Sequence, residues 1–196
     1  MDWKRRIQRA EELAEESPVL PELLHFYCEI ARFQGAVAEG PTPANLEALR
    51  ALSVRSLSDP MHAFFARVLR QAGGMPRLDA TTRESACPSC GERPVASVLR
   101  LEGGFQLCSM CFREWEFQPS RCPHCGEQEK RRLYRSDEMT HVCVEACETC
   151  GVYLKSIDLT RDPRAVPEVD ELASVFLDLW AMEHGYTKLQ TNLFGI

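Results

Sequence analysis

The sequence lacks a long apolar run. No stretch of its 196 residues reaches the roughly 18 consecutive apolar residues that a membrane-spanning helix needs, so we expect no membrane insertion. The N-terminal segment also lacks the apolar core of a secretory signal, because Lys4, Arg5 and Arg6 lead directly into an acidic stretch. We therefore expect a cytoplasmic protein in a compartment that keeps thiols reduced.

An excess of positive charge is also missing. The formal net charge is -6, whereas a nucleic-acid binder needs a basic face to neutralise phosphates. The sequence also contains only five histidines, and no Ser/His/Asp or Cys/His set is visible among them. These absences argue against nucleic acid as a partner and predict a protein that is not an enzyme.

The ten cysteines are the most informative residues that are present. Eight of them form four Cys-x-x-Cys pairs, here termed knuckles: Cys87 and Cys90, Cys108 and Cys111, Cys122 and Cys125, and Cys147 and Cys150. Because disulfides are rare in a reducing compartment, this spacing predicts metal ligands. Two knuckles together supply the four sulfurs of a tetrahedral site.

The spacing between knuckles predicts how they pair. Seventeen residues separate Cys90 from Cys108 and 21 separate Cys125 from Cys147, which is enough for a hairpin, but only ten lie between Cys111 and Cys122. We therefore predict two metal ions per chain, one shared by knuckles one and two and the other by knuckles three and four. A crossed pairing is the alternative.

A closed four-thiolate site leaves no open position for a substrate. A structural role for the metals is therefore the first interpretation, and a redox or sensing role is the alternative. Tetrahedral thiolates suit both iron and zinc, so the sequence leaves the metal open.

Three further residues are weaker candidates. We expect Cys143 to be a half-buried small residue on a strand, with a spare ligand or a reactive thiol as the alternative. Cys28 lies in an apolar helical stripe and is predicted to be part of the core. His124 lies inside the third knuckle, where we expect it to contact solvent or the ligands instead of the metal.

The periodicity of the apolar residues and the positions of proline and glycine predict an α+β fold. It consists of an N-terminal helical bundle followed by two rubredoxin-like or zinc-ribbon metal modules and a C-terminal helix. The expected units are a helical domain over 1–80, a first four-cysteine ribbon over 85–120, and a second ribbon with a packing helix over 121–196.

The expected helices of the first unit cover residues 4–16 and begin again at Pro21, Pro43 and about Pro60, where proline suits the first turn. In the ribbons, Gly103 and Gly104 predict a hairpin turn. Further strands are expected over 131–135, 140–146 and 152–159, followed by one helix over 169–184 with Leu172, Phe176, Leu179 and Trp180 on its inner face.

Residues 130–135 of the second ribbon form a basic strand that contains Arg131, Arg132 and Arg135, and Arg121 is a fourth exposed arginine candidate. Charged residues on an edge strand discourage aggregation, and this is the simplest interpretation. The alternative is a docking face for acidic groups of a partner protein.

The chain resembles the formate dehydrogenase accessory protein family, FdhE. The resemblance is carried by the four knuckles together with five segments: residues 153–159, 170–173, 177–180, 183–186 and 192–195. Knuckles alone occur in many zinc ribbons, whereas their combination with the Tyr-Leu-Lys strand and the C-terminal helix is much more specific.

This resemblance implies a cytoplasmic assembly protein, or chaperone, for respiratory formate dehydrogenase. It would bind the catalytic subunit of that enzyme and hold iron in rubredoxin-like sites. Two rivals from other classes are a zinc ribbon that binds nucleic acid and a rubredoxin-like electron carrier. The sequence leaves the oligomeric state open, and a homo-oligomer is among the options.

Overall fold

The structure is a computed structural model that describes residues 2–16, 21–40, 64, 67–68, 71–72, 85–118 and 120–196. The helix expected from Pro43 lies outside the described residues, as does most of the one expected from Pro60. No helix in the described part is both long and apolar enough to cross a bilayer.

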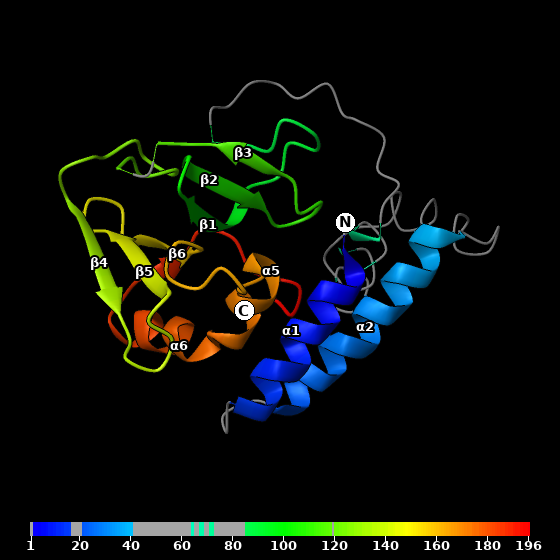
Figure 1. Ribbon diagram of the computed structural model, residues 1–196. Helices are drawn as coiled ribbons and strands as arrows, with labels where there is room; N and C mark the ends of the chain where they lie inside the picture. The colour runs from blue at the N-terminus through cyan, green and yellow to red at the C-terminus, as the bar shows by residue number, and fades with distance from the viewer. Residues whose placement is uncertain are drawn as a thin grey trace.

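Within residues 2–40 of the described part, α1 (Trp3–Glu16) and α2 (Pro21–Glu39) pack side by side (Figure 1). Both were predicted from their apolar periodicity, and Pro21 begins α2 as expected. Leu13, Leu24 and Tyr27 are buried between the helices and the C-terminal part of the chain. The α+β class predicted from the sequence is thus confirmed.

One mixed sheet of seven strands contains both cysteine-rich regions. Its strands are β1 (Pro94–Arg100), β2 (Gly103–Cys108), β3 (Glu114–Glu116), β4 (Arg131–Arg135), β5 (Val142–Cys147), β6 (Val152–Asp158) and β7 (Thr187–Lys188). The order is β3-β2-β1-β6-β5-β4, and β7 pairs with β6 beyond this path. The hairpin predicted at Gly103 and Gly104 is the one between β1 and β2.

The two halves of the sheet join where β1 pairs with β6 in parallel, with Ser97 opposite Ser156. Every other pairing among β1–β6 is antiparallel. The ribbons therefore do not sit as separate sheets, because the edge of one is hydrogen-bonded to the edge of the other.

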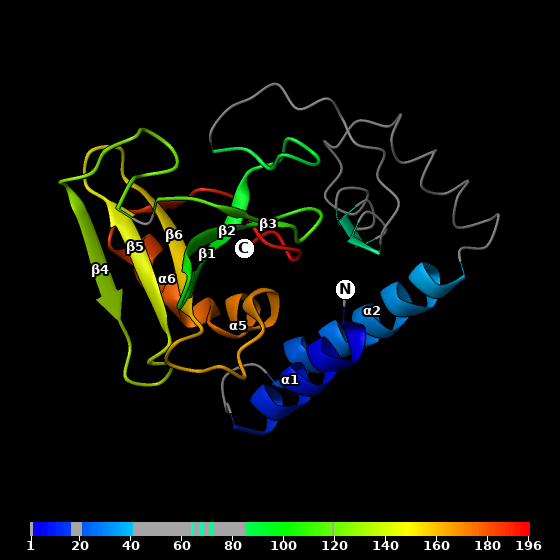
Figure 2. The same cartoon turned by 45° about the horizontal axis from the view of Figure 1, so that its top comes forward.

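The sheet has two different faces. Val98, Val144 and Ile157 belong to the apolar core on one face, which also contains Leu177 and Ala181 from the helix that covers it (Figure 2). The other face is polar, because the same register places Ser97, Ser156, Cys143 and Arg135 in one row across four strands. This second face is where the cavity described below lies.

The single helix predicted over 169–184 is wrong, because the structure has two helices, α5 (Pro167–Ala173) and α6 (Val175–Glu183). Ser174 separates them with φ -94° and ψ 32°. Its hydroxyl donates to the carbonyl oxygens of Asp170 and Glu171, and such local bonds compete with the helical ladder. The turn changes the direction of the chain before α6. As a result Leu179, which was predicted to face inward, is 56% exposed.

Ion pairs fix α1 against α5. The Nε atom of Arg6 lies 3.0 Å from Glu168, and Arg9 lies 2.6 Å from Asp170, with both arginines buried. Asp170 also meets Nε2 of His141 at 2.8 Å. Because Asp170 is fully buried, these partners offset the cost of its desolvation.

Candidate functional site

The structure brings the eight knuckle cysteines together as two clusters. The first cluster contains Cys87, Cys90, Cys108 and Cys111, and the second contains Cys122, Cys125, Cys147 and Cys150. Within each cluster, all four sulfurs lie within 4.8 Å of one another. The neighbouring arrangement is therefore the one the fold shows, and not the crossed one.

The sulfur spacing fits a tetrahedral ion. In the first cluster, Cys87 and Cys111 lie 3.6 Å apart and Cys90 and Cys108 lie 3.3 Å apart. In the second, Cys122 and Cys150 are separated by 3.8 Å and Cys125 and Cys147 by 3.6 Å. A metal–sulfur bond of about 2.3 Å places tetrahedral sulfurs about 3.8 Å apart. Each cluster can therefore hold one metal ion.

The knuckles share one backbone turn. In three of them the residue after the second cysteine is a glycine with positive φ, namely Gly91, Gly126 and Gly151. The N–H of each glycine donates to the carbonyl of the first cysteine at 2.8–2.9 Å. In the second knuckle this position is Phe112, a non-glycine residue with φ 52°.

The surroundings of the sulfurs favour a bound cation. Backbone N–H groups of Ser89 and Met110 point at the sulfurs of Cys87 and Cys108, at 3.4 and 3.3 Å. Hydrogen bonding to Cys111 and the other two thiols, together with burial, raises the pKa of Cys108. Four crowded thiols cannot all ionise alone, whereas a metal ion compensates their combined charge.

The second cluster has an additional link between its knuckles. The Oε2 atom of Glu127 accepts a hydrogen bond of 2.7 Å from the hydroxyl of Thr149, which lies within the fourth knuckle. This bond and those from the N–H groups of Glu129 and Gln128 lower the pKa of Glu127 to about 2. Glu127 therefore stays ionised and holds the third knuckle to the fourth at neutral pH.

The other two cysteines and His124 do not belong to either cluster of candidate ligands. Cys28 is in the helical core, as predicted. Cys143 is only 3% exposed, more buried than predicted, and lines the polar face of the sheet. Burial raises the pKa of its thiol to about 12, so it is not a thiolate at neutral pH. His124 is exposed beside the third knuckle.

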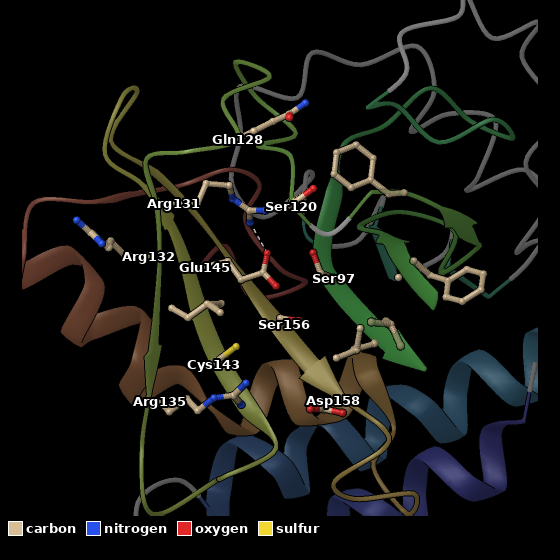
Figure 3. A pocket seen from close by; sticks show the side chains of 16 residues that line it. Ser97, Ser120, Gln128, Arg131, Arg132, Arg135, Cys143, Glu145, Ser156 and Asp158 are labelled. Carbon is tan, nitrogen blue, oxygen red and sulfur yellow. Dashed lines mark hydrogen bonds and ion pairs between the residues drawn. The ribbon is translucent and has the colours of Figure 1, made fainter. Parts of the chain in front are cut away.

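A cavity of about 330 Å³ lies on the polar face of the sheet, between the β1–β2 hairpin and β4 (Figure 3). Ser97, Ser156 and Asp158 form part of its floor, and Phe105 and Leu133 lie among its apolar lining residues. The sequence did not predict this cavity, because the parallel pairing of β1 with β6 brings together residues from separate ribbons.

Three of the four candidate arginines line this cavity, namely Arg131, Arg132 and Arg135. Arg131 forms an ion pair with Glu145 and its side chain is 12% exposed. Arg132 points outward, 3.1 Å from Glu148, with its side chain 62% exposed (Figure 3). Arg121 lies at a different hollow beside the third knuckle, so the four arginines do not form one patch.

The sequence also did not predict a buried ionic network between β6 and the helices α5 and α6. Lys155 lies 2.6 Å from Asp178 and 3.1 Å from Glu171, and Lys188 lies 3.0 Å from Asp178. The hydroxyl of Tyr153 donates to Asp178 at 2.8 Å. The strand alternation around residues 153–157 placed Lys155 on the same face as Tyr153, which is the signal that could have revealed it.

Comparison with known protein families gives two matches. Residues 86–118 match the family model for the central domain of FdhE, and residues 120–194 match the model for its C-terminal domain. Each match contains one of the cysteine clusters.

Individual relatives agree with the family models. A protein FdhE homolog of Aquifex aeolicus is 38% identical over 116 residues, which is 56% of this chain and 41% of that protein. Protein FdhE of Escherichia coli O9:H4 is 29% identical over 136 residues, or 67% of this chain and 44% of that protein. The matched region thus spans less than half the length of these relatives.

A solved structure has the same fold. The crystal structure of FdhE from Pseudomonas aeruginosa aligns with a TM-score of 0.77 at 22% identity, covering 98% of this chain and 94% of that one. The sequence, the two cysteine clusters and the fold therefore agree, and the chain belongs to the FdhE family.

Proposed function

We propose that this chain is a cytoplasmic accessory protein for the maturation of formate dehydrogenase, and that it binds the catalytic subunit of that enzyme. The observation that carries the proposal is the match of both cysteine-rich regions to the FdhE family models. The family resemblance implies formate dehydrogenase as the partner. The residues that the structure describes provide the candidate docking surface.

In this proposal the metals have a structural role. Each cluster holds one iron or zinc ion with four thiolates, which leaves no ligand position for a substrate. The chain would then be a binding protein and not an enzyme. Metal binding orders short strands that bury little apolar surface of their own, so the docking surface is rigid before the partner arrives.

The cavity of about 330 Å³ is the proposed docking face. It combines arginine side chains at its edge with partly exposed apolar residues, and Leu133 is 61% exposed. Acidic groups of the catalytic subunit would approach Arg135 and, at the outer edge of β4, Arg132, whose pair with Glu148 is exposed to solvent. The pair of Arg131 with Glu145 is largely buried, so we assign Arg131 a role in holding the cavity wall.

A pull-down with the formate dehydrogenase catalytic subunit tests the proposal. The double variant Arg132→Glu/Arg135→Glu should bind at least tenfold more weakly, because charge reversal at an interface costs about 1.4 kcal/mol or more. Arg164→Glu is the matched control, since Arg164 is exposed away from the cavity residues, and it should bind normally.

Two results would contradict the proposal at different levels. Normal binding by the double variant would remove the cavity as the docking face and leave the accessory role intact. Failure of the wild-type protein, loaded with two metal ions, to retain the catalytic subunit would overturn the accessory role itself.

A further inference from the structure

The two cysteine clusters differ in their access to solvent. In the first, Cys87 and Cys108 are 0% exposed, Cys90 is 5% exposed, and Met110 and Trp115 pack around them. In the second, Cys125 is exposed. A ligand atom open to solvent is the one that an incoming molecule reaches first, so the two sites will not exchange metal equally.

An open hollow of about 290 Å³ lies directly beside Cys125. Its lining includes Phe117, Arg121 and His124, together with the third knuckle itself. The guanidinium of Arg121 lies over the turn, because a Cβ placed on Gly126 would be 3.5 Å from Nη2. The corresponding positions at Gly91 and Gly151 have nothing within 4 Å, so among the three glycine turns this cation is found only at the third knuckle.

We propose that the second cluster is a metal-exchange site, and that the hollow beside Cys125 binds a small anionic thiol that replaces this ligand. The inference rests on metal occupancy of both clusters, which is part of the proposed function. In the exchange, the bond between the metal and Sγ of Cys125 breaks and a bond to the incoming sulfur forms. The proton of the incoming thiol ends on Cys125.

The hollow favours an anionic thiol for electrostatic reasons. Arg121 carries a permanent positive charge, and it lies beside the position where the incoming sulfur must arrive. A carboxylate on the same small molecule can pair with the guanidinium, which raises the local concentration of its sulfur. A neutral thiol of similar size gains no such attraction.

Burial determines which ligand leaves. Cys122 and Cys147 are 3% and 1% exposed, and Cys150 is less open than Cys125. In the first cluster the most accessible sulfur belongs to Cys111, which is only partly exposed, and Met110 and Trp115 pack around the cluster. Cys125 is therefore the sulfur that an incoming group displaces.

The test uses the 196-residue chain loaded with cobalt(II), whose thiolate absorption reports each occupied site. The metal content is measured first, and two equivalents are expected. Mercaptoacetate is the anionic probe and 2-mercaptoethanol the neutral one, with a chromogenic chelator in solution to collect released metal. One equivalent should leave in a fast phase and the other in a phase at least tenfold slower.

Variants locate the fast phase. Arg121→Gln should slow release by mercaptoacetate about threefold or more, because the attraction between opposite charges is lost, and leave release by 2-mercaptoethanol unchanged. Arg113→Gln is the matched control, since Arg113 follows the knuckle at Cys108 and Cys111 and is exposed; neither rate should change. Iodoacetamide added during the fast phase should label Cys125 before the other seven ligands.

Several outcomes would overturn the inference. Release of both metals in one phase would remove the difference between the clusters, and first labelling of Cys90 or Cys111 would place exchange at the wrong one. An equal effect of Arg121→Gln on both thiols would remove the anion site. A protein that binds fewer than two equivalents would instead contradict the metal occupancy on which the proposed function also depends.

Discussion

Phe112 is the residue at which the repeated knuckle turn departs from its pattern. It takes the positive φ that glycine takes in the other three knuckles. Its ring lies 4.6 Å from the guanidinium carbon of Arg6 and packs with the core between the sheet and the helices. The contact of Phe112 with Arg6 links the turn of the first cluster to α1 and offsets the backbone strain at this position.

This positive φ predicts that glycine at position 112 gives a more stable protein than alanine does. Both Phe112→Ala and Phe112→Gly lose the aromatic contacts, at a cost of roughly 2–4 kcal/mol for a partly buried ring. Phe112→Gly should nevertheless be the more stable by about 1 kcal/mol, because only glycine adopts a positive φ without strain. Urea unfolding with saturating metal measures the difference, and a more stable alanine variant would contradict it.

Cys143 gives a second prediction at this scale. Since burial raises the pKa of its thiol to about 12, Cys143→Ala should leave the metal content at two equivalents per chain. In the wild type, Cys143 should react with iodoacetamide at pH 7.5 far more slowly than an exposed thiol. Elemental analysis checks the metal content and peptide mass spectrometry checks the labelling, and loss of one metal from the variant would show that Cys143 is a ligand.

The ligand residues could be grouped from the sequence because their spacing is a local property. A Cys-x-x-Cys turn is formed by a few consecutive residues, and the glycine that follows marks its positive φ. The exposure of Cys125 and the burial of Cys87 could not be predicted in this way. Both depend on which distant side chains, such as Trp115, pack over the cluster.

Most of the described helices and strands could be predicted from the periodicity of their apolar residues. β4 has the predicted bounds, 131–135, and the hairpin of β1 and β2 lies where Gly103 and Gly104 placed it. The pairing of β1 with β6 was not predictable, because alternation shows that a segment is a strand but not which strand lies beside it. The break at Ser174 was missed because both sides of it carry helical periodicity.

A buried lysine links β6 to both C-terminal helices and predicts a large loss of stability when it is removed. Lys155 is fully buried between Glu171 and Asp178, and burial lowers its pKa. Lys155→Met should cost about 3–5 kcal/mol, because it leaves buried carboxylates with one cation fewer. Lys130→Met, at an exposed position, is the control and should stay within about 0.5 kcal/mol.

Chemical denaturation at constant metal concentration makes this comparison. A Lys155→Met variant as stable as the wild type would mean that Lys188 alone satisfies Asp178 and Glu171. The ion pairs of Lys155 would then be redundant for stability.

At the scale of the whole molecule, acid should loosen the helical part from the sheet. Burial raises the pKa of Asp170, but hydrogen bonds from His141 and Arg9 outweigh it and hold the pKa below its ordinary value. A lowered pKa in the folded state contributes stability that is present above about pH 4 and is lost as the pH falls further.

The measurement compares the wild type with Asp170→Asn at pH 7 and at pH 4 and below, by urea unfolding. The variant should be less stable at pH 7, because Arg9 loses its buried counter-charge, and should lose less stability on acidification. Subtracting the two profiles removes the contribution of thiolate protonation, which both proteins share. Parallel profiles would show that Asp170 does not control the acid response.

The parallel pairing of β1 with β6 also has a consequence for biosynthesis. The N-terminal ribbon leaves the ribosome first, and until β6 follows, β1 has an edge with no partner, which is a template for aggregation. At roughly 5–20 residues per second, translation takes several seconds to reach Ser156. Metal bound by Cys87, Cys90, Cys108 and Cys111 during those seconds would order the first ribbon before β6 is available to cover that edge.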